Sequence, residues 1–179
     1  MVAIRKAGAY SKKYARPYTR ISKKKSKSFI RTVPPSKVVK FSAGTKKNYG
    51  EKKFETEIRI VSEQNVQIRD NALEASRQSI TRELDRRIPR QYYFEVRVFP
   101  HHILRENKML TGAGADRMQS GMQQSFGKAM GRAALVSSGK DIFLISTSGD
   151  KQVRAAREIL KSIRAKLPCK TRIVVSKVI

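Results

Sequence analysis

The sequence predicts an α+β fold of two layers, in which two helices cover one face of a mixed or antiparallel sheet. One observation is that apolar and polar residues alternate in several short segments, as they do in half-buried strands. The other is that apolar residues recur every three or four positions in two longer segments, as they do in amphipathic helices. Packing both helical stripes on one side of the sheet is the simplest way to bury them.

The first half of the globular part contains a strand, a helix and a second strand. The segment FETEIRI, residues 54–60, alternates and predicts a strand. Asn71 lies three residues before Glu74, a spacing typical of a capping box, so we expect a helix to begin there and to end at Pro89. The segment YYFEVRVFP then predicts another strand. The helix has an apolar stripe of Ala72, Leu73, Ser76, Ile80 and Leu84.

A long loop, residues 101–132, separates these elements from a hairpin, a second helix and a last strand. The segments AALVS and IFLIST flank a turn at residues 138–140 and predict the hairpin. The second helix is expected over about residues 150–166, before Pro168, and CKTRIVV predicts the last strand. This order is nearest to the split β-α-β arrangement of ferredoxin-like folds. The stripe of the second helix comprises Val153, Ala156, Leu160, Ile163 and Leu167.

The charge is large and unevenly distributed. The chain of 179 residues has 40 Lys and Arg against 14 Asp and Glu, a net charge of +26, which attracts polyanions and exceeds what an enzyme of small metabolites needs. Residues 1–50 contain 15 of the basic residues and no acid, whereas residues 51–179 contain the other 25 and all 14 acids. We therefore expect an extended basic arm over residues 1–50 and one α+β domain over residues 51–179.

Two interpretations of the arm remain open. Its apolar residues are too few to offset the entropy of ordering about fifty residues, so it is either a solubilising tail or a segment that becomes ordered on a polyanion. The complete absence of acids favours the second. Aromatic and basic side chains also alternate at Tyr14, Arg16, Tyr18 and Arg20, which suits contacts with phosphates and bases.

The long loop contains no complete catalytic or cofactor motif. GAGADR has Arg117 where a dinucleotide-binding fingerprint needs glycine, and Gly127-Lys128 is followed by alanine, which excludes a P-loop. His101, His102 and Glu106 could suggest a metal site, but adjacent residues of an extended chain point to opposite sides, so packed or phosphate-facing histidines are favoured. Cys169 is the only cysteine, which excludes an internal disulfide. We expect no enzyme, metal or cofactor.

The same loop carries features of a flexible, RNA-contacting finger. Its five glycines let the backbone turn sharply, and basic residues outnumber acids in it. Met118, Met122, Phe126 and Met130 recur every four residues and predict a short helix packed on the core.

Several long runs of residues resemble one known family. They are PHHILRENKML from Pro100, GAGADRMQSGM from Gly112, SFGKAMGR from Ser125 and KLPCKTRIV from Lys166, together with VRVFP and with RPYTR in the arm. The resemblance extends over nearly the whole chain. On these residues the chain resembles the large-subunit ribosomal proteins called L-sixteen in bacteria, and specifically the archaeal and eukaryotic branch called L-ten-e.

This resemblance implies an α/β-hammerhead type of two-layer fold and a place on large-subunit rRNA, between the central protuberance and the peptidyl-transferase centre. It implies that the long loop points toward A-site and P-site tRNA, that neighbouring ribosomal proteins are partners, and that the protein performs no chemistry itself. An obligate homo-oligomer is not expected. The sequence shows no signal peptide and no apolar run long enough for a membrane span, so we expect a cytoplasmic protein without a membrane partner.

Two groups of basic residues are the candidate binding sites. For rRNA we expect the arm to use Arg16, Arg20, Lys23, Lys24, Lys25, Lys27, Arg31, Lys46 and Lys47. Near tRNA and the peptidyl-transferase centre we expect the loop to use Arg105, Lys108, Arg117, Lys128 and Arg132. A free-standing nucleic-acid-binding protein and an RNA-modifying enzyme are the alternatives, but the sequence lacks a groove-reading pattern for the first and a cofactor loop for the second.

Overall fold

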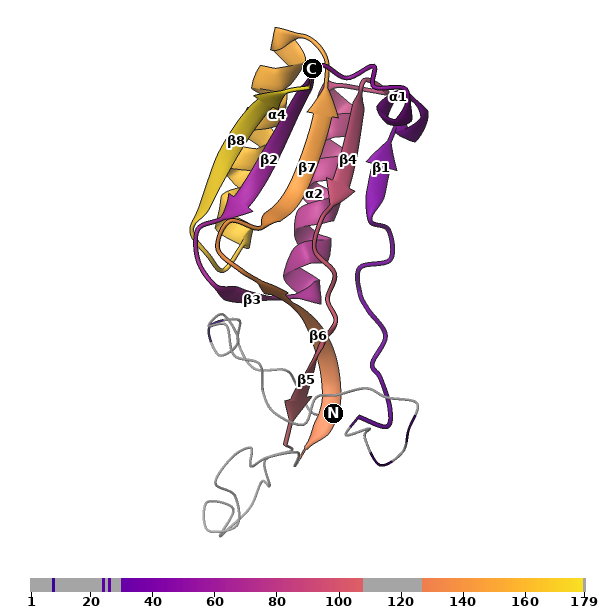
Figure 1. Ribbon diagram of the computed structural model, residues 1–179, viewed down its shortest axis with the longest axis vertical. Coiled ribbons are helices and arrows are strands. Elements are labelled where there is room, and N and C mark those ends of the chain that lie inside the picture. Colours follow the sequence, from indigo (N-terminus) through magenta and orange to yellow (C-terminus); the bar gives the residue numbers. More distant parts are fainter. Residues whose placement is uncertain (1–7, 9–23, 25, 27–29, 108–126, 179) are drawn as a thin grey trace.

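The computed structural model describes residues 8, 24, 26, 30–107 and 127–178. Within them, one large sheet backed by helices forms a domain, and a smaller sheet projects from one end of it (Figure 1). No helix in these ranges is long and apolar enough to cross a membrane. The predicted α+β architecture of two layers is confirmed.

The main sheet has five strands in the order β1-β4-β7-β2-β8, and every neighbouring pair is antiparallel. Its four longer strands occur in the order expected for a split β-α-β arrangement, because the first strand along the chain, β2, lies between the third and the last. The strands are β1 (Ser42–Gly44), β2 (Thr56–Ser62), β4 (Tyr92–Val96), β7 (Asp141–Thr147) and β8 (Thr171–Lys177).

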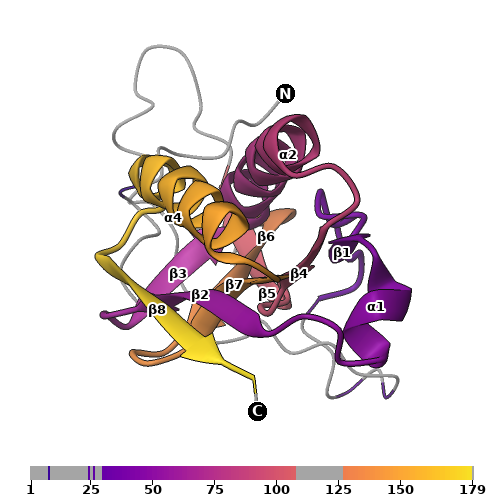
Figure 2. The same ribbon diagram turned by 90° about the horizontal axis from the view of Figure 1, so that it is seen from above.

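Two long helices cover one face of this sheet. They are α2 (Asp70–Arg87) and α4 (Asp150–Ile163), which lie side by side in Figure 2, and the single-turn η3 (Arg164–Lys166) continues α4. A guanidinium nitrogen of Arg87 lies 3.0 Å from a carboxylate oxygen of Glu158 and joins the two helices. A short helix, α1 (Lys46–Gly50), lies beside the sheet and away from α4 (Figure 2).

The core lies between the main sheet and these two helices. Phe94 and Phe143 contact each other there, with ring centroids 5.8 Å apart, and neither is exposed. The helical stripes are buried as their periodicity predicts, and so are the alternating residues Tyr92, Phe94, Val96 and Val98. The positions of both helices and of the strands at β2, β4 and β8 are therefore confirmed to within a few residues.

A second sheet, which we call the ribbon, has three antiparallel strands in the order β3-β6-β5. They are β3 (Val66–Arg69), β5 (His102–Glu106) and β6 (Lys128–Val136). The ribbon extends from the end of the domain farthest from the C-terminus (Figure 1). Its inner residues join the main core, whereas Leu104 and Ala133 form a separate apolar cluster of two.

The junction between the two sheets is tied by hydrogen bonds. The chain passes from β2 into β3 and from β6 into β7, so the same two segments pair in both sheets. The N–H of Gly139 donates to the carbonyl of Ser62 at 2.8 Å, and the N–H of Ser62 donates to the carbonyl of Lys140 at 3.0 Å. The hydroxyl of Ser138 also donates to the carbonyl of Glu63 at 3.0 Å.

The predicted hairpin over residues 133–147 is wrong. β6 and β7 do not pair with each other, because each pairs instead with the segment that runs through β2 and β3. Gly139 has φ +81°, which favours glycine, so a turn does lie at residues 138–140. The strands on either side of this turn pair with other strands and not with each other.

Other expected boundaries also change. The helix begins at Asp70 rather than Asn71, and no side chain caps it. The buried Asp70 carboxylate accepts the N–H of Asn71 at 2.9 Å and that of Lys37 at 3.2 Å. The ends of the expected loop over residues 101–132 form β5 and part of β6, so Met130 is in a strand and not in a helix. β1 and α1 lie within residues 1–50 yet belong to the domain, because β1 pairs with β4.

Candidate nucleic-acid interface

The basic residues expected to bind RNA differ in their exposure to solvent. Of the described ones, Lys24, Arg31, Lys46, Lys47 and Lys128 are exposed. The others are Arg105, which is buried, and Arg132, which is partly buried. Arg16, Arg20, Lys23, Lys25, Lys27, Lys108 and Arg117 lie outside the described residues.

The segment over residues 30–38 lies against the ribbon and the start of α2. Nε of Arg132, in β6, donates to the carbonyl of Pro34 at 2.6 Å. The Lys37 N–H donates to Asp70, as noted above, and the side chains of Ile30 and Val38 are buried. This segment therefore holds its basic residues beside the ribbon.

A cavity of about 460 Å³ lies where this segment meets the ends of β5 and β6. It brings together three of the expected residues from distant parts of the sequence: Arg31, Arg105 and Lys128. Among the described residues that line it, none is acidic. The described residues that line it are Ile30, Arg31, Thr32, Arg105, Gly127, Lys128 and Ala129.

Arg105 has a different place from the one expected of an RNA-contacting loop residue. It is only 2% exposed and belongs to β5, where it is the largest fully buried side chain. A buried guanidinium is costly unless it is engaged by the protein, and Arg105 does make such interactions. Arg105 therefore lines the cavity as a buried side chain, whereas Arg31 and Lys128 are exposed.

An irregularity in the pairing of β5 and β6 shapes this end of the ribbon. Leu104 pairs with Gly131 but Arg105 pairs with Ala129, so Met130 has no partner across the ladder. Such a bulge bends a strand and redirects the side chains around it. Gly127, next to Lys128, has φ +118°, a conformation that favours glycine.

The charged side chains among the described lining residues of the cavity are all basic. Neither Arg31 nor Lys128 forms an ion pair with any residue that the structure describes, and both side chains are exposed. Glu106 pairs with Lys128 across the ladder, but Glu106 is only 2% exposed and does not line the cavity. Two exposed cations around a polar cavity suit the phosphates of a nucleic acid.

Comparison with known proteins identifies the family. The family model described as ribosomal protein L16p/L10e matches residues 17–174. The chain belongs to this family.

Curated relatives of this L16p/L10e chain include archaeal proteins named large ribosomal subunit protein uL16. The one from Methanococcus maripaludis strain C7 is 42% identical over 177 residues, covering 98% of this chain and 96% of its own length. The one from Thermofilum pendens is 41% identical over 160 residues, covering 89% of each. The one from Methanoculleus marisnigri is 42% identical over 166 residues, covering 91% of this chain and 95% of its own.

The L16p/L10e chain places Lys46 and Lys47 far from the ribbon. They lie on α1, at the opposite end of the domain (Figure 1). The ring of Tyr49, also in α1, stacks on that of Tyr93 with centroids 4.2 Å apart, and the N–H of Thr45 donates to the carbonyl of Tyr92 at 2.9 Å. The described residues of the arm that we expect to bind rRNA therefore lie on two separate surfaces.

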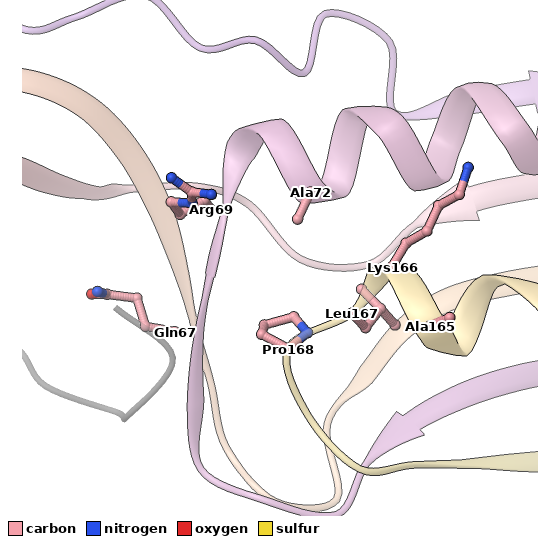
Figure 3. Close-up of a pocket in the computed structure, with 7 residues that line it drawn as sticks. All are labelled: Gln67, Arg69, Ala72, Ala165, Lys166, Leu167 and Pro168. Atoms are coloured by element: carbon pink, nitrogen blue, oxygen red, sulfur yellow. The ribbon is translucent and has the colours of Figure 1, made fainter. Parts of the chain in front are cut away.

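Another cavity, of about 180 Å³, lies between β3, the start of α2 and the chain after η3 (Figure 3). Its cations are Arg69 and Lys166, and both are engaged within the protein, Lys166 with the hydroxyl of Ser79. It is therefore a weaker candidate for binding an anion than the cavity of Arg31 and Lys128. Its lining comprises Gln67, Arg69, Ala72, Ala165, Lys166, Leu167 and Pro168.

The two histidines occupy different environments. His101 is exposed, with Nδ1 3.1 Å from the carbonyl oxygen of Phe99, whereas His102 is 5% exposed in β5. In the described ranges, no three His, Cys, Asp or Glu residues lie close enough to hold a metal ion. Burial raises the pKa of the Cys169 thiol, which keeps it protonated and weakly nucleophilic at neutral pH.

Sequence reasoning missed several residues that build these surfaces. The expected site did not include Ile30, Thr32 or Ala129 of the large cavity, because uncharged residues give no signal of RNA binding in a sequence. The bulge at Met130 could not be foreseen either, since it depends on how β5 and β6 pair.

Proposed function

We propose that this chain is a structural constituent of the large ribosomal subunit and binds rRNA through its basic arm and the cavity of Arg31, Arg105 and Lys128. The observation that carries the proposal is that three cations distant in sequence line one cavity, with no acid among its described lining residues. Membership in the L16p/L10e family and relatives named as large-subunit proteins support the same function.

The proposed mechanism is electrostatic and needs no catalytic group. Each phosphate that meets a lysine or arginine releases counterions, so affinity falls with salt by about 0.7–0.9 log units per log unit for each contact. The arm residues from Arg16 to Arg31 would meet one part of the rRNA, and Lys46 and Lys47 would meet another. The chain would in this way stabilise folded rRNA in cytoplasmic ribosomes, next to neighbouring ribosomal proteins.

We further propose that the segment between β5 and β6 approaches tRNA near the peptidyl-transferase centre. It would use Lys108 and Arg117, together with Lys128 and Arg132 at its base. The ribbon supports this proposal because it carries the two ends of the segment away from the domain (Figure 1). Replacing residues 108–126 by a short linker should leave the protein on the large subunit but weaken A-site and P-site tRNA binding.

The rRNA proposal is tested by charge reversal at the cavity. Filter binding of the purified chain to large-subunit rRNA fragments is measured against salt for Arg31→Glu with Lys128→Glu. Losing two contacts should make the negative slope of log affinity against log salt shallower by about 1.4–1.8. The control reverses Lys151 and Lys161, two exposed lysines on α4 with the same charge change. Equal slopes for both double variants would show that the cavity does not bind phosphate.

A further inference from the structure

A cavity of about 270 Å³ lies beside α1, on the face of the main sheet opposite α2 and α4. The core residues Phe94 and Phe143 point to the helices. Tyr93 lies one position before Phe94 and Ser146 three positions after Phe143, so both point to the other face. The cavity is lined by Tyr49, Gly50, Lys52, Phe54, Glu57, Ser146 and Val178.

The floor of this cavity consists of polar side chains from two neighbouring strands, β2 and β7. Glu57 of β2 is the direct antiparallel partner of Ser146 of β7, and Ser146 is the direct partner of Tyr93 of β4. Directly opposite residues of antiparallel strands have their side chains next to each other on one face. The carboxylate of Glu57 and the hydroxyl of Ser146 are therefore neighbours.

The buried hydroxyl of Ser146 is evidence that this cavity binds a ligand. Ser146 is 0% exposed, and its Oγ has no hydrogen-bond partner in the described part of the chain. Buried polar groups are nearly always hydrogen-bonded, and leaving one unsatisfied destabilises a protein. Because Ser146 lines the cavity, a polar atom of a bound molecule would supply the partner that the protein does not.

The walls are aromatic and the rim is basic. The ring of Tyr49, already stacked on Tyr93, forms one wall, and the 6% exposed ring of Phe54 contributes to another. Burial, and then the neighbouring Glu57 carboxylate, raise the pKa of Tyr49. Lys46, Lys47 and Lys52 are exposed around this site and form no ion pair with described residues.

We propose that this cavity binds one unpaired nucleobase of RNA and prefers guanine. Guanine presents two adjacent donors, N1–H and N2–H, to a carboxylate such as that of Glu57, whereas each of the other bases presents a single donor group on that edge. The Ser146 hydroxyl would pair with a further polar atom of the base, and the lysines at the rim would hold the flanking phosphates. An apolar side chain of a protein partner would leave the Ser146 hydroxyl unsatisfied, which favours the base.

This inference rests on the proposed function, because the RNA must be supplied by the particle. The experiment uses large subunits assembled with the full chain and probed with kethoxal, which reacts with N1 and N2 of unpaired guanines. In wild-type particles one guanine near the protein should be protected. Glu57→Gln keeps the shape of the side chain but removes one of the two acceptors, so the reactivity of that guanine should rise about tenfold.

The matched control is Glu55→Gln, which removes the same charge from an exposed residue two positions away that does not line the cavity. It should leave the protected guanine unchanged. Particles that contain the protein but show no guanine specific to Glu57→Gln would overturn the inference while leaving the proposed function intact. Failure of the wild-type chain to sediment with the large subunit would instead overturn the proposed function.

Ser146→Ala separates binding from folding. Because the hydroxyl has no partner among the described residues, its removal should leave the melting temperature of the purified chain unchanged or higher. In assembled particles the same variant should partly expose the protected guanine. A lower melting temperature together with normal protection would mean that Ser146 has only a structural role. A photo-crosslinker at Val178 that captures a ribosomal protein rather than rRNA would assign the cavity to protein docking.

Discussion

The main sheet and the outer part of the ribbon are stabilised by different kinds of contact. Between the main sheet and its helices lies a continuous apolar core that includes Phe94 and Phe143. The outer ribbon has only the cluster of Leu104 and Ala133, and its strand β5 also buries polar and charged side chains. These buried polar residues are His102, Arg105 and Glu106.

This difference indicates how stability is shared. A large apolar core supports its domain without a partner, since burial of apolar surface is the main favourable term in folding. The outer ribbon, with little apolar surface, depends on polar contacts such as that of Arg132 with Pro34. It therefore has low local stability of its own, which is usual for segments that bind a partner.

The largest expected effect is on the domain core. Phe94→Ala removes a fully buried ring that contacts Phe143, and it should lower the free energy of unfolding by about 3–5 kcal/mol. Urea unfolding followed by circular dichroism measures this loss. A change below about 1 kcal/mol would contradict the view that this core stabilises the whole chain.

A smaller and more local effect is expected in the ribbon. Leu104→Ala should reduce the protection of β5 and β6 amides by about 2 kcal/mol while α2 and α4 keep theirs, because Leu104 belongs to the separate cluster. Hydrogen exchange of the purified chain reads both regions at once. An equal loss in the helices would show that the two regions unfold as one unit.

The hydrogen bond between β4 and α2 gives the next prediction. The hydroxyl of Tyr92 donates to a carboxylate oxygen of Asp85 at 2.5 Å, and Tyr92→Phe should lower the free energy of unfolding by about 1–2 kcal/mol at neutral pH. Burial, and then Asp85, raise the pKa of Tyr92 above its usual 10.0.

The pH dependence of that variant follows from the same shift. The folded state holds the Tyr92 proton more tightly than the unfolded state, so the stabilisation is complete below pH 10 and is lost as the pH rises above it. Unfolding measured between pH 8 and 11 should therefore show the wild type losing its advantage over Tyr92→Phe at the alkaline end. Parallel curves would refute this assignment.

The smallest effect is on the surface of α2. Two carboxylate oxygens of Glu74 lie 2.6 and 2.8 Å from nitrogens of Arg77, and Glu74→Gln should cost about 0.3–0.5 kcal/mol at pH 7. The hydrogen bond from Arg77 lowers the pKa of Glu74 from 4.5, so this contribution is present above pH 4.5 and disappears as the pH falls. Thermal unfolding at pH 7 and pH 3 measures the difference.

The sequence was sufficient for elements with a strong local period. Val153, Ala156 and Leu160 recur at helical spacing, and the helix lies where they predict it. Apolar and polar residues alternate over residues 54–60, and the bounds of β2 differ from this predicted segment by two residues at each end. In these segments the local pattern and the tertiary packing favour the same structure.

Elements that depend on distant partners could not be predicted. β3 and β5 are short, and consecutive residues in them are buried. They therefore lack the alternation of apolar and polar residues that marks a half-buried strand. The cavity of Arg31 and Lys128 forms only when the arm lies against the ribbon, and no local pattern records that contact. Ser146 gave a weak signal, as a polar residue in the apolar run IFLIST, although its position opposite Glu57 emerged only from the strand register.

The tied junction at Ser62 and Gly139 has a mechanical consequence. Because both chain segments cross from one sheet to the other there and are bonded to each other, the ribbon cannot rotate independently like an arm on a hinge. The orientation of the ribbon is therefore set by the domain itself. Wherever the domain is seated, that seating also fixes the direction in which the far end of the ribbon points.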